Sequence, residues 1–229
     1  MFSFFQKRSK IHVDCFTWNS EIAELFPVLD AKDCIPDFWK TLPTTVALAG
    51  PGRGTMKTCP GVSELYKTGL ILQTWSDLYI NTENGLKWEP QPAAESHNVS
   101  QFNNHFKQHS HLKFVSPWKF VEKTGVKFLY TNLFWHDDTF KPMVVNGMIE
   151  YKYQHTTSCN MMIPKTMFPK SMIIPAGKPL CQIIPLSEKD ISFKIHVLSD
   201  NEFKKFDPYI FSFNGHYFKR KKMLKDLGK

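Results

Sequence analysis

The chain has 229 residues, of which 42% are hydrophobic and 22% are charged, a composition typical of a folded globular protein. That length supplies one well-buried core, or at most two small domains. No run of 18 apolar residues occurs, so we expect no membrane-spanning helix.

Positive charge gathers at the two ends of the chain. The net charge is +8, of which residues 1–10 contribute +3 and residues 214–229 contribute +5. Residues 11–213 are therefore neutral overall, and we predict that they form a single domain between a basic arm and a basic tail. A nucleic-acid-binding domain spreads positive charge over a folded face. Nucleic acid is therefore expected to bind only through the C-terminal tail.

Strand and turn signals in chain order predict a mainly β fold. Aromatic residues make up 14% of the chain, which favours strands, and 15 prolines interrupt long helices. Residues 10–17 alternate as a strand does, whereas 35–42 and 59–69 read as short helices, the second ended by Gly69. Asn84 and Gly85 mark a hairpin turn. Further strands are predicted at 70–75, 77–82, 86–88, 112–115, 118–121, 126–133, 143–153, 158–163, 172–174, 180–186 and 191–198.

The breaks between these strands indicate the architecture. Pro, Gly or Asn stands between most of them, and no helix-length segment recurs from one strand to the next. This pattern is typical of a sandwich or a distorted barrel with a few short helices, and not of repeated β–α–β units.

A polar segment at 91–111 has no clear strand pattern and holds a cluster of imidazoles. The cluster consists of His97, His105, His109 and His111. His105 and His109 would share a face of a helix, whereas His109 and His111 would share a face of a strand. Either arrangement could direct two nitrogens at a divalent metal such as Zn or Fe.

A catalytic metal at this cluster would need one more protein ligand and an open position for water. Glu95, His97 and His136 are candidates for that ligand. The alternative is a polar loop whose histidines are solvated or bonded to backbone carbonyls.

Two other motifs suggest chemistry only weakly. Gly50-Pro-Gly-Arg-Gly54 could cradle a phosphate with its backbone N–H groups, but no GK[ST] follows, and a surface turn explains the motif equally well. His136-Asp137-Asp138 could act in acid–base chemistry in a suitable pocket. Its alternative is an ordinary turn.

The basic tail is a further candidate site. Lys219, Arg220, Lys221, Lys222 and Lys225 could contact phosphates. Tyr217 or Phe218 could stack on a base. The alternative is a solvated terminal helix.

The cysteines and the N-terminus indicate a cytoplasmic protein. The five cysteines are odd in number and form no CxxC pair, so we predict reduced, mostly buried thiols. The N-terminus places apolar residues before Lys7 and Arg8, the reverse of a secretory signal.

Several segments resemble a family of uncharacterised proteins from marine bacteriophages and bacteria. They are residues 57–60, 69–77, 116–130, 145–150 and 174–185. The resemblance covers most of residues 35–190 and implies no activity, although a viral protein would act in the cytoplasm of its host.

The C-terminal half is also distantly similar to the dUTPase and dCTP-deaminase superfamily. Gly147-Met-Ile-Glu150 and Gly177-Lys-Pro-Leu-Cys-Gln-Ile-Ile184 stand where that superfamily has its glycine-turn segments. The similarity implies a β-clip fold, in which the carboxylate that activates water would be Glu150 or would be missing. The superfamily's Arg-Ser-Ser motif is absent around 131–134.

Three functional hypotheses follow. The first is a non-enzymatic binding protein whose partner is another protein or a small molecule, since no catalytic constellation is specific. The second is a metal-dependent enzyme that uses the histidines of 97–111. The third is a nucleotide-binding protein of dUTPase-like fold.

Overall fold

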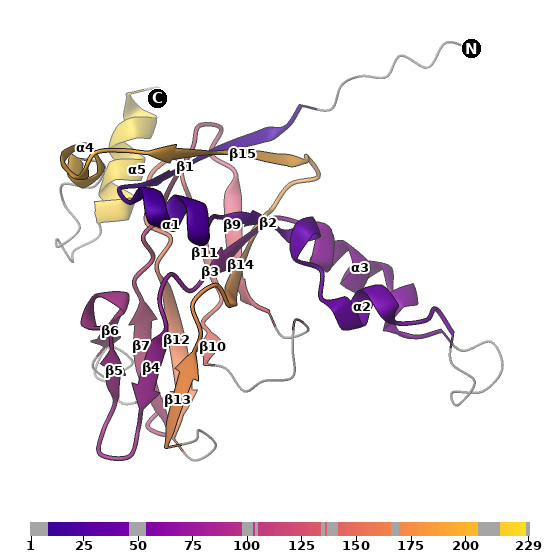
Figure 1. The fold of residues 1–229 in the computed structure, drawn as a ribbon. Helices are drawn as coiled ribbons and strands as arrows, with labels where there is room; N and C mark the ends of the chain where they lie inside the picture. The colour runs from indigo at the N-terminus through magenta and orange to yellow at the C-terminus, as the bar shows by residue number, and fades with distance from the viewer. Residues whose placement is uncertain are drawn as a thin grey trace, which may run out of the picture.

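A computed structural model describes residues 9–45, 54–97, 103, 105–133, 136, 142–165, 170–205 and 216–227. Over these residues the protein is mainly β, as predicted, with fifteen strands in four sheets and five short α-helices (Figure 1). No sheet of the described part closes on itself. The fold is therefore consistent with a sandwich and not with a closed barrel.

The four sheets have simple strand orders. One sheet is β15 (Ile191–Val197), β1 (Ile11–Thr17) and β8 (Lys119–Glu122). A second is β11 (Gly147–Glu150), β9 (Lys127–Asn132), β14 (Pro179–Pro185), β3 (Leu70–Gln73) and β2 (Leu29–Asp30). A third is β10 (Met143–Val144), β12 (Cys159–Pro164), β7 (His109–Phe114) and β6 (Ala94–His97). The fourth is β13 (Ser171–Ile174), β4 (Leu78–Asn81) and β5 (Lys87–Glu89).

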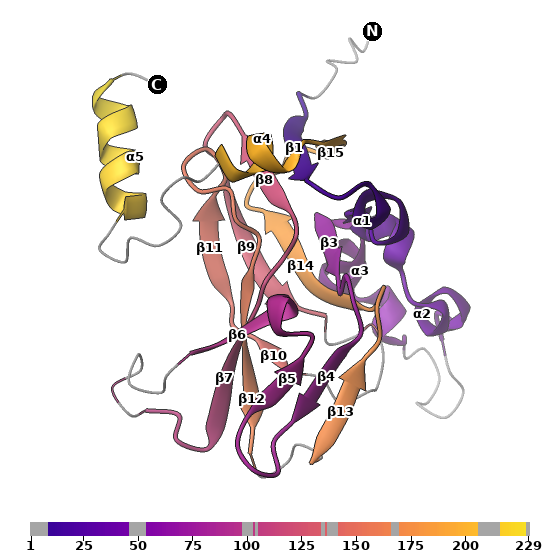
Figure 2. The ribbon, with the colours of Figure 1, turned by 60° about the vertical axis from the view of Figure 1, so that its left-hand side comes forward.

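The helices lie outside the sheets. They are α1 (Ser20–Leu25), α2 (Asp37–Thr41), α3 (Pro60–Lys67), α4 (Asp200–Lys205) and α5 (His216–Asp226). Helices α2 and α3 stand on one side of the sheets and α5 on the other (Figures 1 and 2).

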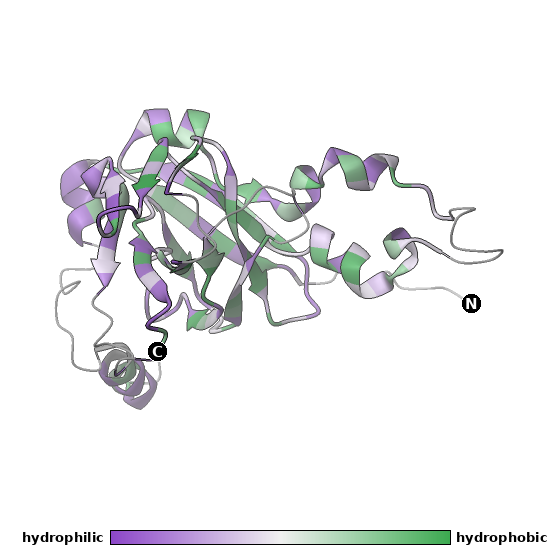
Figure 3. Cartoon of the chain, turned by 90° about the horizontal axis from the view of Figure 1, so that it is seen from below, coloured by the Kyte–Doolittle hydropathy of each residue, from purple (hydrophilic) through white to green (hydrophobic). Residues whose placement is uncertain are grey.

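One large hydrophobic core joins the sheets, beside a small separate cluster of Ala31, Ile71 and Leu133. Buried and less buried residues alternate along β1 and β4, as a half-buried strand requires. Hydrophobic and hydrophilic stretches are interleaved through the strands of the body (Figure 3). At the centre, the ring of Tyr151 contacts those of Phe120 and Phe128 at centroid distances of 5.1 and 5.0 Å. The Tyr151 hydroxyl is hydrogen-bonded to that of Tyr130. This bond satisfies both buried phenols.

The first and last strands of the fold pair with each other. Strands β1 and β15 are parallel, with Asp14 opposite Lys194 and Phe16 opposite His196. Because this pairing joins segments 180 residues apart, the sheet ties the two ends of the described body together.

The structure corrects the prediction for residues 91–111. Strand β6 lies in this segment and strand β7 begins in it at His109, and the two strands pair in antiparallel fashion. A polar residue, His111, stands at a buried position of β7, and β6 has a single apolar residue, so the apolar alternation that signals a strand is absent here. Helix α1 was also missed, although Asn19 supplies a typical N-cap by accepting the N–H groups of Glu21 and Ile22.

Candidate functional site

The structure brings two of the four predicted histidines into contact. His97 on β6 lies opposite His111 on β7, and their rings stack with centroids 4.6 Å apart and planes at 27°. His111 is only 4% exposed. Burial, and next the neighbouring His97, lower the pKa of His111, while a hydrogen bond with Asn160 acts in the opposite direction.

The other two histidines lie apart from this pair. His109 begins β7 and meets the ring of Phe106 edge-on at 6.2 Å. His105 is exposed on the turn before β7. Of the two arrangements considered for this segment, the extended one, which puts His109 and His111 on one strand, is therefore the one that forms.

Of the three candidates for a further metal ligand, His97 is the one in contact with His111, and the other two are engaged elsewhere. Glu95 forms an ion pair with Lys113 at 3.1 Å, and the ring of His136 lies 5.5 Å from that of Tyr66. No group of three or more His, Cys, Asp or Glu side chains among the described residues is arranged to hold a metal ion. In two stacked rings the nitrogen lone pairs point side by side and do not converge on one point. A metal bound by His97 and His111 would therefore require one ring to turn.

The two weaker motifs fall largely outside the described residues. Gly50 to Arg53 and the carboxylates Asp137 and Asp138 lie there. The phosphate-cradle and acid–base hypotheses therefore stay as predictions.

A constellation that the sequence analysis missed lies on the outer face of the β15–β1–β8 sheet. Nε2 of His196 is 2.8 Å from Oδ1 of Asp14, and Nε2 of His12 is 3.5 Å from the same oxygen. Nδ1 of His12 is in turn 3.2 Å from Oγ of Ser192. The alternation of His12 and Asp14 was visible in the sequence, but nothing local places His196 beside them.

The residue types of this constellation could form an acid–base site, but the residues lie where two neighbouring strands contact each other. The ring of His196 stacks on Phe16 at 4.8 Å, and all four polar residues lie on a pair of adjacent strands. Cross-strand pairs of this kind stabilise sheets. The Asp14–His196 contact therefore has a clear structural role, namely to join β1 to β15.

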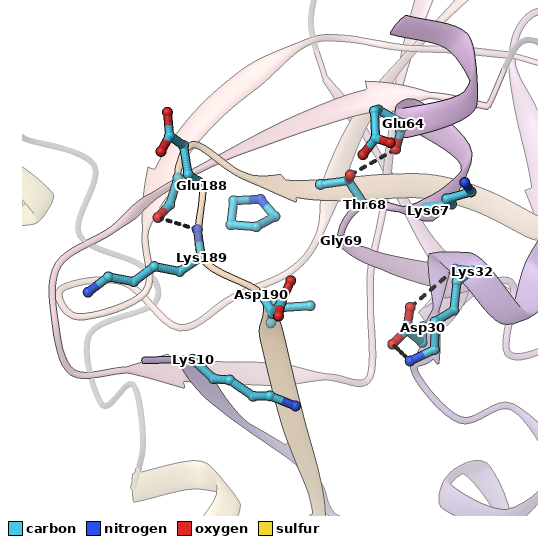
Figure 4. A pocket seen from close by; sticks show the side chains of 13 residues that line it. Lys10, Asp30, Lys32, Glu64, Lys67, Thr68, Gly69, Glu188, Lys189 and Asp190 are labelled. Carbon is cyan, nitrogen blue, oxygen red and sulfur yellow. Dashed lines mark hydrogen bonds and ion pairs between the residues drawn. The ribbon is translucent and has the colours of Figure 1, made fainter. Parts of the chain in front are cut away.

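A charged hollow of about 440 Å³ lies where β14 ends and β15 begins (Figure 4). Its lining includes four lysines and four carboxylates, which are Lys10, Lys32, Lys67, Lys189, Asp30, Glu64, Glu188 and Asp190. Asp30 and Lys32 pair at 2.9 Å. Because the two signs balance, the hollow favours neither an anion nor a cation.

Helix α5 carries the basic tail predicted from the sequence. It lies beside β11 (Figure 2), where Lys221 forms an ion pair with Glu150, the last residue of β11. The Lys221 ammonium also stands 5.6 Å from the ring centroid of Tyr153. The tail thus forms a short helix, and one of its lysines is directed to the body.

The remaining lysines of α5 whose side chains are described point to solvent. They are Lys219, Lys222 and Lys225, all exposed. Phe218, one residue before Lys219, is 73% exposed. Isolated exposed apolar residues are ordinary, but a large aromatic ring among lysines on a helix has the composition of a nucleic-acid contact.

Glu150 has a clear role in this arrangement. Its carboxylate is only 7% exposed and is neutralised by Lys221. The similarity to dUTPase-like proteins would place a water-activating carboxylate at this position, whereas here the side chain is engaged in docking α5.

None of the helices in the described ranges is long and apolar enough to cross a membrane. Compared with known proteins, the chain matches no family model, no curated protein and no solved structure.

Proposed function

We propose that the protein is a non-enzymatic binding protein that contacts single-stranded nucleic acid through α5. One observation carries the proposal: Lys219, Lys222 and Lys225 are exposed on a single helix next to the 73% exposed ring of Phe218. Lysines bind phosphates by displacing counterions. An exposed aromatic ring stacks on an unpaired base without requiring a particular sequence.

The distribution of charge supports this surface over the rest of the molecule. Residues 214–229 carry +5, whereas residues 11–213 are neutral overall. The charged hollow adds no excess of either sign. A polyanion is therefore attracted to the tail and not to the body.

The arrangement of apolar residues on α5 disfavours a membrane surface as the partner. An interfacial helix gathers its apolar residues on one face. At 100° per residue, Phe218 lies about 140° around the helix from Met223, and Lys219 and Lys222 fall between them. On the other side of Met223, Leu224 lies about 100° away, and the sequence places Arg220 between the two. Basic residues thus interrupt the apolar face that would insert among lipids.

Fluorescence anisotropy with a short labelled single strand, measured over a series of salt concentrations, tests the proposal. Replacing Lys219, Lys222 and Lys225 by Gln should reduce the slope of log K against log salt by about 2, since each phosphate contact contributes about 0.7. Phe218→Ala should weaken binding by about 1–3 kcal/mol and leave that slope unchanged.

A matched control replaces three exposed lysines of the body, Lys87, Lys189 and Lys194, by Gln. This variant has the same net charge as the α5 variant and should keep the wild-type slope. Equal slopes for all three proteins would contradict the proposal. Tighter binding to duplex DNA, or to anionic vesicles, than to the single strand would assign α5 a different partner.

A further inference from the structure

The ion pair between Lys221 and Glu150 removes one lysine from the exposed surface of α5. The Glu150 carboxylate is 7% exposed and the Lys221 side chain 23% exposed. The same ammonium lies over the ring of Tyr153, which is itself buried. Lys221 therefore faces the body, while its neighbours Lys219 and Lys222 face solvent.

Burial makes this ion pair costly to separate. A buried carboxylate that loses a compensating cation keeps the desolvation cost without the attraction. A phosphate at the surface gains only a screened contact with the released lysine. The pair is thus expected to persist when a polyanion binds to the exposed side of α5.

We propose that Glu150 withholds Lys221 from nucleic acid and so sets the affinity of α5 below what its five basic residues would otherwise give. This inference rests on the proposed function of α5. It assigns Glu150 a positioning role: through Lys221 it holds one face of the helix toward the body and turns the other face outward.

The test uses Glu150→Gln in the full chain, with the same labelled single strand. Neutralising Glu150 frees Lys221 to contact a phosphate, so the slope of log K against log salt should steepen by about 0.7. By the same relation, affinity at 0.1 M salt should rise about fivefold. Glu95→Gln is the matched control, because it also removes one negative charge, from an exposed pair with Lys113; it should leave the slope unchanged.

A second variant separates this effect from a general change in charge or in folding. Lys221→Gln alone should show the wild-type slope of log K against log salt, since Lys221 makes no phosphate contact in the wild-type protein. The double variant Glu150→Gln/Lys221→Gln should lack the steeper slope and the higher affinity expected of Glu150→Gln. A wild-type slope in Glu150→Gln, while the α5 triple variant still binds weakly, would overturn this inference and leave the proposed function standing. A shallower slope of log K against log salt in Lys221→Gln would also overturn this inference. Absence of nucleic-acid binding by the wild type would overturn both the inference and the proposed function.

Discussion

The side-chain amide of Gln182 donates a hydrogen bond to the carbonyl oxygen of Thr68, 2.8 Å away, and a second one to that of Leu65 at 2.6 Å. Both acceptors are at the C-terminal end of α3, where the last carbonyls of a helix run short of partners and the carbonyl of Leu65 accepts a long bond of 3.5 Å from the N–H of Thr68. Gly69 follows with φ +94°, and a Cβ there would lie 2.2 Å from the carbonyl oxygen of Ile183. Strand β14 thus fixes the point at which α3 ends and β3 begins.

Replacing Gln182 should destabilise the fold. Gln182→Leu removes the side-chain donor from the carbonyl of Thr68 and leaves that of Leu65 with the N–H of Thr68 at 3.5 Å, which should lower the free energy of unfolding by about 1–3 kcal/mol. Gln182→Glu should cost more at neutral pH, because it places a carboxylate against two carbonyl oxygens. Urea denaturation measures both changes. A Gln182→Leu protein as stable as the wild type would show that this cap contributes little.

Local patterns predicted most of the strands but little of the candidate site. The alternation of residues 10–17 and the Gly69 stop signal correspond to β1 and to the end of α3. The pairs Asp14–His196 and Glu150–Lys221 join residues 182 and 71 positions apart. Such contacts depend on which strands become neighbours, and a single sequence carries no local signal for that choice. Charge counting located the basic tail but not the lysine that turns inward.

Burial of His111 predicts a specific dependence of stability on pH. Its pKa in the folded protein is lowered from the ordinary 6.5, so the unfolded chain binds the proton more readily. The contribution of neutral His111 to the free energy of unfolding is fully present above about pH 6.5. It is lost as the pH falls toward the folded-state pKa, by at most about 1.4 kcal/mol per pH unit. Thermal unfolding from pH 8 to pH 5 measures this loss.

Two variants isolate His111 in that measurement. His111→Gln removes the titrating ring and should flatten the decline below pH 6.5, whatever its effect on absolute stability. His105→Gln removes an exposed histidine from the turn before β7 and should leave the decline unchanged. If His111→Gln and His105→Gln show the same loss of stability between pH 8 and pH 5, His111 is not the source of that loss.

Metal binding by the predicted histidines stays a separate prediction, which the structure makes more specific. A metal in this segment would draw on His97 and His111, because these are the two imidazoles in contact. His97→Ala and His111→Ala should then each lower the Zn or Fe content, whereas His105→Ala should not. Elemental analysis decides the matter. A wild-type protein that is metal-free on purification and takes up no divalent ion on titration contradicts the prediction.

The five thiols are all unpaired in the structure, and they differ in their accessibility to reagents. Cys15, Cys159 and Cys181 are buried, whereas Cys34 and Cys59 are only partly so. Burial, followed by the charges of Asp33 and Asp30, raises the pKa of Cys34 to about 11. At pH 8 only about one Cys34 thiol in a thousand is then the reactive thiolate.

Native maleimide labelling at pH 8 should therefore modify Cys59 first and Cys34 slowly, with the three buried thiols reacting only in denaturant. Asp33→Asn removes the largest charge contribution and should accelerate labelling of Cys34 without changing that of Cys59. Peptide mapping by mass spectrometry follows each site separately. Equal rates for Cys34 with and without Asp33 would show that this carboxylate does not hold the thiol in its protonated form. Fewer than five reactive thiols in denatured, unreduced protein would reveal a disulfide.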